Sequence, residues 1–276
     1  MTTRNPATLC TIRATQTRLL LILASLGLAS CQPQTEPSDY FPLRSGLQWE
    51  YAVWHQPTKP DSSDASDGPT FRSSDTPALH QPILPAVFRI ETLGSTDVAA
   101  LSAQPSQQAW IRRTSLGTDY YLQPREDGIY RVAKRTLVEL TPRIDARPRL
   151  VMPLPVQEQT SRIWSSISMP YLLQSVINPE GMKADTLSFP MTYRIVSLNE
   201  TVEVPAGRFE RCLLIEGQTE LTLYADPLKG DLTIPITTRE WYAAGVGLIK
   251  LERDEPIHTE IFVGGKLTMA LQSFES

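Results

Sequence analysis

The sequence holds few residues that could catalyse a reaction or cross-link the fold. Its 276 residues include three cysteines and three histidines, scattered along the chain: Cys10, Cys31, Cys212, His55, His80 and His258. It lacks the G-x-S-x-G and H-E-x-x-H motifs, a glycine-rich phosphate loop and a C-x-x-C pair. These motifs mark hydrolases, metalloproteases, nucleotide binders and redox enzymes. We therefore expect a protein that is not an enzyme, with no catalytic residues, no cofactor and no metal ligands.

Two isolated side chains, Cys212 and His258, could be a nucleophile and a metal ligand, but a structural role is more common for each. Cys212 precedes the apolar residues 213–215, so a packed strand position is favoured over a nucleophile, which would need a nearby base. His258 could bind a metal with Asp254 and Glu255, but a solvated turn after a strand is the more frequent setting for such residues. We assign neither residue a catalytic or metal-binding role.

Glycine and positive charge are also scarce. Fourteen glycines stand against 23 prolines, a balance that disfavours long helices and favours strand edges and turns. The 26 basic residues are outnumbered by 30 acidic ones, and residues 1–30 hold three of the basic residues and no acid. The rest of the chain therefore has a net charge of −7, which argues against nucleic acid as a partner.

No apolar run is long enough for a transmembrane helix, which needs about 20 apolar residues. The longest run, residues 19–28, follows Arg4, Arg13 and Arg18. A short apolar run after basic residues is typical of a secretory signal peptide. We predict that residues 1–30 are such a peptide and are removed.

Directly after this run, Leu28-Ala29-Ser30-Cys31 resembles the lipobox of bacterial lipoproteins. The resemblance implies that Cys31 is the lipid-attachment site, with a diacylglyceryl thioether, cleavage before it and acylation of the new amino terminus by a fatty acid such as palmitate. Such an anchor holds a protein stably to a membrane, because two or more acyl chains are buried. Gln32 is not the aspartate of many inner-membrane lipoproteins, which implies the outer membrane, periplasmic side. An ordinary or uncleaved signal peptide is the alternative.

The mature chain is predicted to hold one folded domain. Residues 31–39 are polar and form the lipidated stalk, and residues 40–276 form a single β-rich periplasmic domain. A stretch at about 56–85, rich in serine, aspartate and proline, is predicted to be a disordered loop within it. We expect a mainly β fold: an antiparallel curved sheet, half-barrel or sandwich with one or two short helices.

Alternation and turn residues predict the elements of that fold. Strands are expected at residues 47–54, 208–217, 220–225, 232–242 and 247–253. Reversals are expected at Asp127-Gly128, at 204–207 and at Gly264-Gly265, since Asp-Gly, Pro-x-Gly and Gly-Gly favour turns. Residues 170–177 are the one segment with helical spacing of apolar residues.

Three stretches resemble segments of a family of uncharacterised bacterial secreted and lipid-anchored proteins. They are YFPLRSGLQWEY at 40–51, TVEVPAGRFERCLLI at 201–215 and EWYAAGVGLIKLE at 240–252. The family carries YFPL..G..W near its start, a PAGxF..C turn and strand, and a WYAxGVGL loop. Ala244 departs from the proline or lysine often found there, and residues 56–85 look like an insertion. The resemblance implies an envelope protein and no established activity.

Two regions are candidates for binding. Trp241, Tyr242, Gly245 and Gly247 could line a ligand mouth, or could be a structural loop with its aromatic rings in the core beside a tight bend. Residues 107–149 hold nine basic and five acidic residues. If they share one face, that face suits anionic lipid or an acidic partner.

We expect an outer-membrane lipoprotein that binds a lipid, a lipoprotein or an envelope protein in the periplasm. Binding of lipid would require a concave apolar face that is left uncovered. The alternative is a structural or accessory subunit of an envelope complex, with a filled core and a protein partner at its strand edges or basic region. An envelope hydrolase with an unrecognised site is the remote alternative, and the sequence leaves the oligomeric state open.

Overall fold

The fold is that of a computed structural model, which describes residues 40–59, 86–97, 108–156, 163–175, 188–226, 230–259 and 261–276. These residues belong to one compact unit, Thr35–Ser276. The predicted signal peptide, the lipobox with Cys31 and residues 60–85 of the predicted loop lie outside the described residues. Within the described residues, no helix is long and apolar enough to cross a lipid bilayer.

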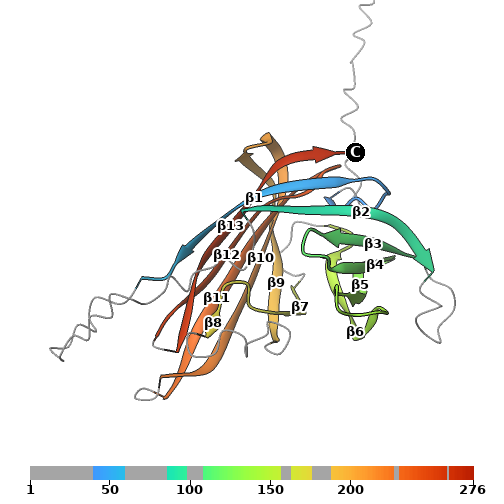
Figure 1. The fold of residues 1–276 in the computed structure, drawn as a ribbon. Coiled ribbons are helices and arrows are strands. Elements are labelled where there is room, and N and C mark those ends of the chain that lie inside the picture. Colours follow the sequence, from blue (N-terminus) through green and yellow to red (C-terminus); the bar gives the residue numbers. More distant parts are fainter. Residues whose placement is uncertain are drawn as a thin grey trace, which may run out of the picture. The chain divides into compact units, whose positions relative to one another are not determined.

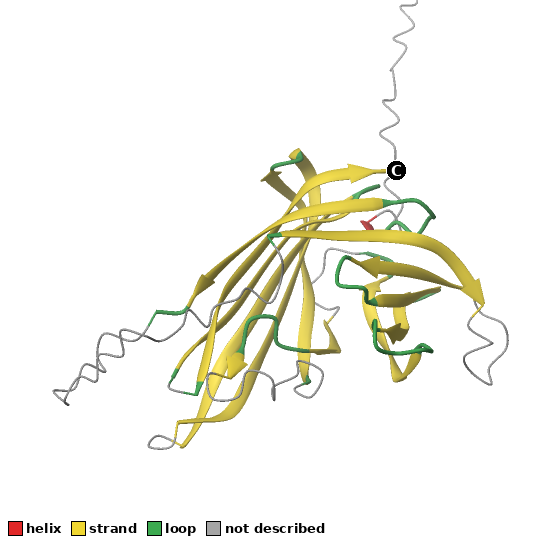
Figure 2. Ribbon diagram, viewed as in Figure 1, coloured by secondary structure: helices red, strands yellow, loops and turns green. Residues whose placement is uncertain are grey.

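Thirteen strands account for most of the described chain (Figure 2). They are β1 Gln48–Pro57, β2 Val87–Asp97, β3 Gln108–Thr114, β4 Asp119–Arg125, β5 Gly128–Arg135, β6 Arg143–Pro153, β7 Ile163–Ser168, β8 Gln174–Ser175, β9 Phe189–Val204, β10 Gly207–Asp226, β11 Gly230–Ala243, β12 Gly247–His258 and β13 Phe262–Glu275. The strand predicted at 47–54 is β1, which continues to Pro57, and the two expected at 208–225 are one strand, β10.

All the strands join one antiparallel sheet, in the order β6-β5-β4-β3-β2-β1-β13-β12-β11-β10-β9-β7, with β8 paired to β13 (Figure 1). The sheet curves so far that its ends, β6 and β7, approach each other. The Arg149 side chain on β6 donates a hydrogen bond to the Ile167 carbonyl on β7 at 3.2 Å. The predicted mainly β, antiparallel curved sheet is therefore confirmed.

The curvature follows from how the strands bury their side chains. Strand β12 alternates buried and partly exposed residues along its length, so one face of the sheet is inward. One core cluster joins both halves of the sheet, with Leu122 and Met152 on one side and Ile195, Leu213 and Tyr242 on the other. Every core cluster is built from residues between Tyr40 and Leu271, so this unit contains its own hydrophobic core and is expected to fold alone.

Two of the three predicted reversals are confirmed. Strands β4 and β5 form a hairpin with Arg125 opposite Gly128, and β9 and β10 form one with Val204 opposite Gly207. The prediction for Gly264-Gly265 is wrong, because both glycines lie inside β13. A Cβ on Gly264 would lie 2.1 Å from the Glu255 carbonyl oxygen, and one on Gly265 would lie 2.3 Å from the Gln56 carbonyl oxygen. Glycine here permits close approach of neighbouring backbones instead of a turn.

The predicted helix at 170–177 is also wrong. Residues 171–173 are irregular, residues 174–175 form β8, and residues 176–177 lie outside the described part. The backbone N–H groups of Tyr171, Leu172 and Leu173 all donate to the Glu255 carboxylate. A buried side chain thus holds residues 171–173 in an irregular conformation by accepting their backbone N–H groups, and apolar spacing alone does not show this. Among the described residues no α-helix is found.

Candidate functional site

A cleft lies where the two ends of the sheet face each other, and we call it the inter-edge cleft. Its volume is about 150 Å³. Ten residues from both ends of the sheet line it: Arg131, Arg149, Leu150, Val151, Trp164, Ser166, Ile167, Tyr193, Ile215 and Glu240. They come from β5 and β6 on one side and from β7, β9, β10 and β11 on the other. The sheet must curve fully for these residues to meet.

The β5–β6 side of the cleft is cationic. Arg131 forms two hydrogen bonds with the Asp145 carboxylate, at 2.8 and 3.0 Å, and both side chains are largely buried. Arg149 lies 3.7 Å from the same carboxylate, so one acid serves two guanidinium groups. Burial and the nearby charge of Arg131 lower the pKa of Arg149, although Asp145 partly offsets them. This side therefore has one positive charge without a matching acid, a setting that favours an anionic ligand.

The opposite wall is aromatic and carries one carboxyl group. The rings of Trp164 and Tyr193 are stacked, with centroids 5.6 Å apart. Glu240 accepts a hydrogen bond from the Tyr242 hydroxyl at 2.5 Å. Burial raises the pKa of Glu240 above its ordinary value, against the opposing effects of that hydrogen bond and of Arg253. The carboxyl is thus harder to ionise than an exposed one.

Beneath this wall, Arg253 and Glu255 on β12 form a buried ion pair, which we call the clamp. Their atoms Nε and Oε1 are 2.8 Å apart, and both side chains are at most 1% exposed. Glu255 also accepts the backbone N–H groups of residues 171–173, as described above. The Arg253 guanidinium donates to the Ser168 hydroxyl and the Met169 carbonyl, each at 3.2 Å. The clamp therefore fixes the chain that follows β7 against the sheet.

The rest of the inward face is largely filled by side chains. Phe41 packs 6.4 Å from Tyr242, and the Arg112 guanidinium lies 4.3 Å above the Phe41 ring. Burial lowers the pKa of Arg112 to about 10, despite the nearby Tyr51 and Tyr242. Leu172 and Leu173 cover further parts of the core. Side chains thus fill much of the inward face in the described residues, and the inter-edge cleft is small.

The structure places the candidate ligand-mouth residues at the β11–β12 reversal. Gly245 and Gly247 have positive φ angles of 75° and 98°, which glycine adopts most readily. Tyr242 is buried in the core, whereas Trp241 is partly exposed beside the Lys250 ammonium group, 4.9 Å from the ring centroid. None of these four residues lines the inter-edge cleft, although the Tyr242 hydroxyl donates a hydrogen bond to Glu240, which does.

The structure also shows the surroundings of Cys212 and His258, the two isolated side chains considered in the sequence. Cys212 is a buried, free thiol in β10, and burial raises its pKa to about 11, with Glu200 adding to the effect. Glu255 belongs to the clamp, and His258 Nδ1 lies 3.0 Å from the Thr58 carbonyl oxygen. Within the described residues, no group of three or more His, Cys, Asp or Glu side chains could hold a metal ion. The lipid-attachment residue Cys31 lies outside the described part of the chain.

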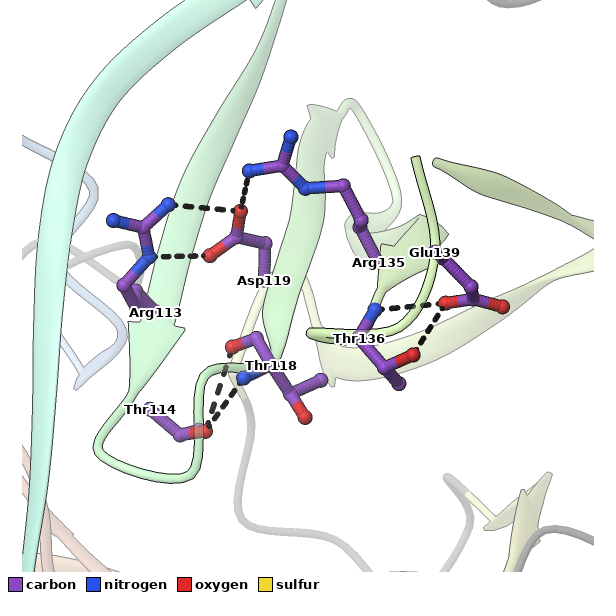
Figure 3. A network of polar contacts seen from close by, with 7 residues as sticks. All are labelled: Arg113, Thr114, Thr118, Asp119, Arg135, Thr136 and Glu139. Carbon is purple, nitrogen blue, oxygen red and sulfur yellow. Dashed lines mark hydrogen bonds and ion pairs between the residues drawn. The ribbon is translucent and has the colours of Figure 1, made fainter. Parts of the chain in front are cut away.

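A second ion-pair network lies in the basic region, strands β3–β6. The Asp119 carboxylate accepts hydrogen bonds from Arg113, at 2.7 and 3.1 Å, and from Arg135, at 2.6 Å (Figure 3). Burial alone would raise the pKa of Asp119, but the hydrogen bonds and charges of the two arginines outweigh it and lower the pKa. The network ties the ends of three neighbouring strands together.

Asp119→Asn is expected to destabilise the domain by about 2 kcal/mol at pH 7, the usual loss for hydrogen bonds to a charged group. Because the pKa of Asp119 is lower in the folded than in the unfolded state, its contribution is complete above about pH 5. The contribution disappears as the pH falls through the folded-state pKa. Urea unfolding from pH 7 to pH 3 should show the two proteins converging at low pH. Asp231→Asn, at an exposed position of β11, is the matched control and should follow the wild type throughout.

Comparisons with known proteins agree in part with the family resemblance. Residues 168–255 match the model of a family described as DUF3108-like. This segment contains two of the three stretches that carry the resemblance, 201–215 and 240–252, together with the clamp. No curated protein matches the chain.

Two solved structures are similar over 86% of this chain, each with 14% sequence identity. One is a candidate lipoprotein from Parabacteroides distasonis, 98% of whose chain is covered, with a TM-score of 0.35. The other is a candidate exported protein with a YmcC-like fold from Bacteroides fragilis, 99% covered, with a TM-score of 0.34. The family match is the more specific result: from β7 to β12, this chain is similar to the DUF3108-like family.

Proposed function

We propose that this protein is a non-enzymatic lipoprotein, anchored to the outer membrane through Cys31, whose periplasmic domain binds the anionic end of an envelope lipid or lipid-modified protein. The ligand group occupies the inter-edge cleft. The observation that carries the proposal is the pairing, in one cleft, of two arginines that share a single acid with a stacked aromatic wall.

The chemistry of the cleft selects the class of ligand. A guanidinium group with reduced solvent contact binds a carboxylate or phosphate by charge-assisted hydrogen bonds. The apolar walls, Leu150, Val151 and Ile215 beside the two aromatic rings, favour an apolar group next to that anion. An amphiphile with an anionic end supplies both features.

The size of the cleft sets how much of the ligand enters. Pockets that enclose a drug-sized ligand have volumes of roughly 300–1,000 Å³. The inter-edge cleft, at about 150 Å³, is smaller. It therefore admits one end of an amphiphile, while the remainder stays outside. This differs from a carrier that buries whole acyl chains.

The binding experiment uses residues 35–276 and a monoacyl phosphoglycerol lipid, followed by tryptophan fluorescence, because Trp164 lines the cleft. Arg149→Gln is expected to weaken binding by about tenfold or more, since it removes a charge-assisted hydrogen bond. Arg194→Gln is the matched control, because Arg194 is more exposed and pairs with Glu216 away from the cleft. A monoacyl glycerol without phosphate should bind more weakly than the anionic lipid. Equal binding of the two lipids, or unchanged binding by Arg149→Gln, would contradict the proposal.

A specific observation also favours the accessory-subunit alternative. In the sheet order, β6 and β7 each pair on one side alone, so each has an edge without a neighbouring strand in the described residues. A partner can add an extended segment to such an edge. Under this alternative a protein copurifies with the domain in place of a lipid.

A further inference from the structure

Three apolar side chains project from the loop between β5 and β6, residues 136–142, which we call the tip. Leu137 is 81% exposed, Val138 is 90% exposed and Leu140 is 96% exposed. On the adjoining β3–β4 hairpin, Leu116 is also exposed, at 47%. Single exposed apolar residues are ordinary, but several at one end of a sheet indicate a contact surface.

The tip is held in shape by hydrogen bonds. The Glu139 carboxylate accepts from the Thr136 backbone N–H at 2.7 Å and from the Thr136 hydroxyl at 2.9 Å (Figure 3). The Glu139 N–H donates to the Thr136 carbonyl oxygen at 3.2 Å. Leu137 packs against Gly117, where an added Cβ would lie 2.4 Å from the leucine side chain. The apolar side chains are therefore presented by a folded turn, and Glu139 is occupied within it.

Positive charge predominates around the tip. Five basic residues lie on the three adjoining strands β3, β5 and β6: Arg113, Arg135 and Arg143 at strand ends, Lys134, which is buried, and Arg147 within β6. Three acidic residues accompany them: Asp119 pairs with Arg113 and Arg135, Glu139 lies 3.6 Å from Arg143, and Asp145 pairs with Arg131 and Arg149, so the five basic residues exceed the three acids by two charges. Arg143 is more than half exposed, and its long contact to Glu139, at 3.6 Å, leaves the guanidinium group open to solvent.

We propose that the tip inserts Leu137, Val138 and Leu140 into the surface of an anionic lipid bilayer, while the flanking arginines contact its headgroups. Apolar side chains at the end of a projecting turn enter the headgroup–acyl boundary of a bilayer, and nearby basic residues add attraction to anionic lipid. A protein partner would need a groove complementary to the tip, whereas a bilayer needs the projection and the charge that the described residues provide. The tip and the inter-edge cleft use different residues, so failure of one proposal leaves the other standing.

The test measures insertion directly with residues 35–276. Cys212 is buried, and the other two cysteines lie before residue 35, so a new surface cysteine can be labelled selectively. Val138→Cys, carrying an environment-sensitive fluorophore, is mixed with vesicles of phosphatidylcholine containing phosphatidylglycerol. We expect a blue shift and a rise in emission with these vesicles and a smaller response with phosphatidylcholine alone. Tyr224→Cys, at a 63% exposed position of β10, is the matched control and should not respond.

Sedimentation with the same vesicles provides a second measurement. Leu140→Asp should weaken binding by more than tenfold, and Arg143→Gln by about fivefold, the expected effect of one basic residue near an anionic surface. Both side chains are exposed, so thermal unfolding of the two variants should match the wild type. The proposal is overturned if the labelled Val138→Cys variant gives no response to anionic vesicles, or if Leu140→Asp sediments as the wild type does.

Discussion

Glu255→Gln is expected to destabilise the domain by about 3–5 kcal/mol, the usual effect of removing one partner of a buried ion pair. The substitution preserves the size of the side chain but removes the charge that faces Arg253. It also places an amide N–H₂ group against backbone N–H groups that now donate to carboxylate oxygens at 2.8 and 2.9 Å. Urea unfolding at pH 7 measures the loss.

The matched control is Glu252→Gln on the same strand. Glu252 pairs with Lys250 at 2.7 Å, but both side chains are about one quarter exposed, so the expected loss is below about 1 kcal/mol. Equal losses for Glu252→Gln and Glu255→Gln would mean that the clamp stabilises the fold no more than a surface pair does. The segment after β7 would then need another explanation for its fixed position.

The second large effect is expected for Gly264→Ala, with a loss of about 3 kcal/mol or more in the free energy of unfolding. The new Cβ would lie 2.1 Å from the Glu255 carbonyl oxygen and 2.9 Å from the Ile257 side chain. Backbone cannot rotate away as a flexible side chain can, so β12 and β13 must separate locally. Urea unfolding again measures the change.

Gly230→Ala is the control that measures how much replacing a glycine lowers the free energy of unfolding when no close contact is created. Gly230 has a positive φ of 75°, but open space surrounds the position of the added Cβ. Its substitution should cost about 1–2 kcal/mol, from backbone conformation alone. If Gly264→Ala were no more costly than Gly230→Ala, the close approach of β12 and β13 would not be the reason for glycine at position 264.

The fold class could be predicted from sequence because its signals are local. In the first half of β1, buried residues alternate with less buried ones, as the alternation in the sequence predicts. The reversals at Asp127-Gly128 and Pro205-Ala206 contain residues that favour tight turns. The turn predicted at Gly264-Gly265 and the helix predicted at residues 170–177 are wrong for a different reason. In both, the decisive partner is Glu255, which lies near in space and is separated in sequence from residues 171–173 by more than 80 positions.

The inter-edge cleft could not be predicted for the same reason. Arg131 and Arg149 lie in the basic region that the sequence indicates, but their opposite wall comes from β7, β9 and β11. Charge counts cannot show that Asp145 serves both arginines, or that Glu240 faces them. Trp241, the aromatic candidate of the sequence, directly follows Glu240, which lines the cleft. Alternate residues of a strand face opposite sides of the sheet, so Trp241 itself does not line the cleft.

The central claim, that the domain binds an anionic amphiphile in the inter-edge cleft, is tested most directly by native mass spectrometry with lipid extraction. Residues 35–276 are secreted to a bacterial periplasm as wild type and as Arg149→Gln, and purified without detergent. We expect one anionic lipid per wild-type domain and a marked loss of that lipid in Arg149→Gln. A ligand-free mass for the wild type, or the same lipid at the same occupancy in both proteins, would contradict the claim.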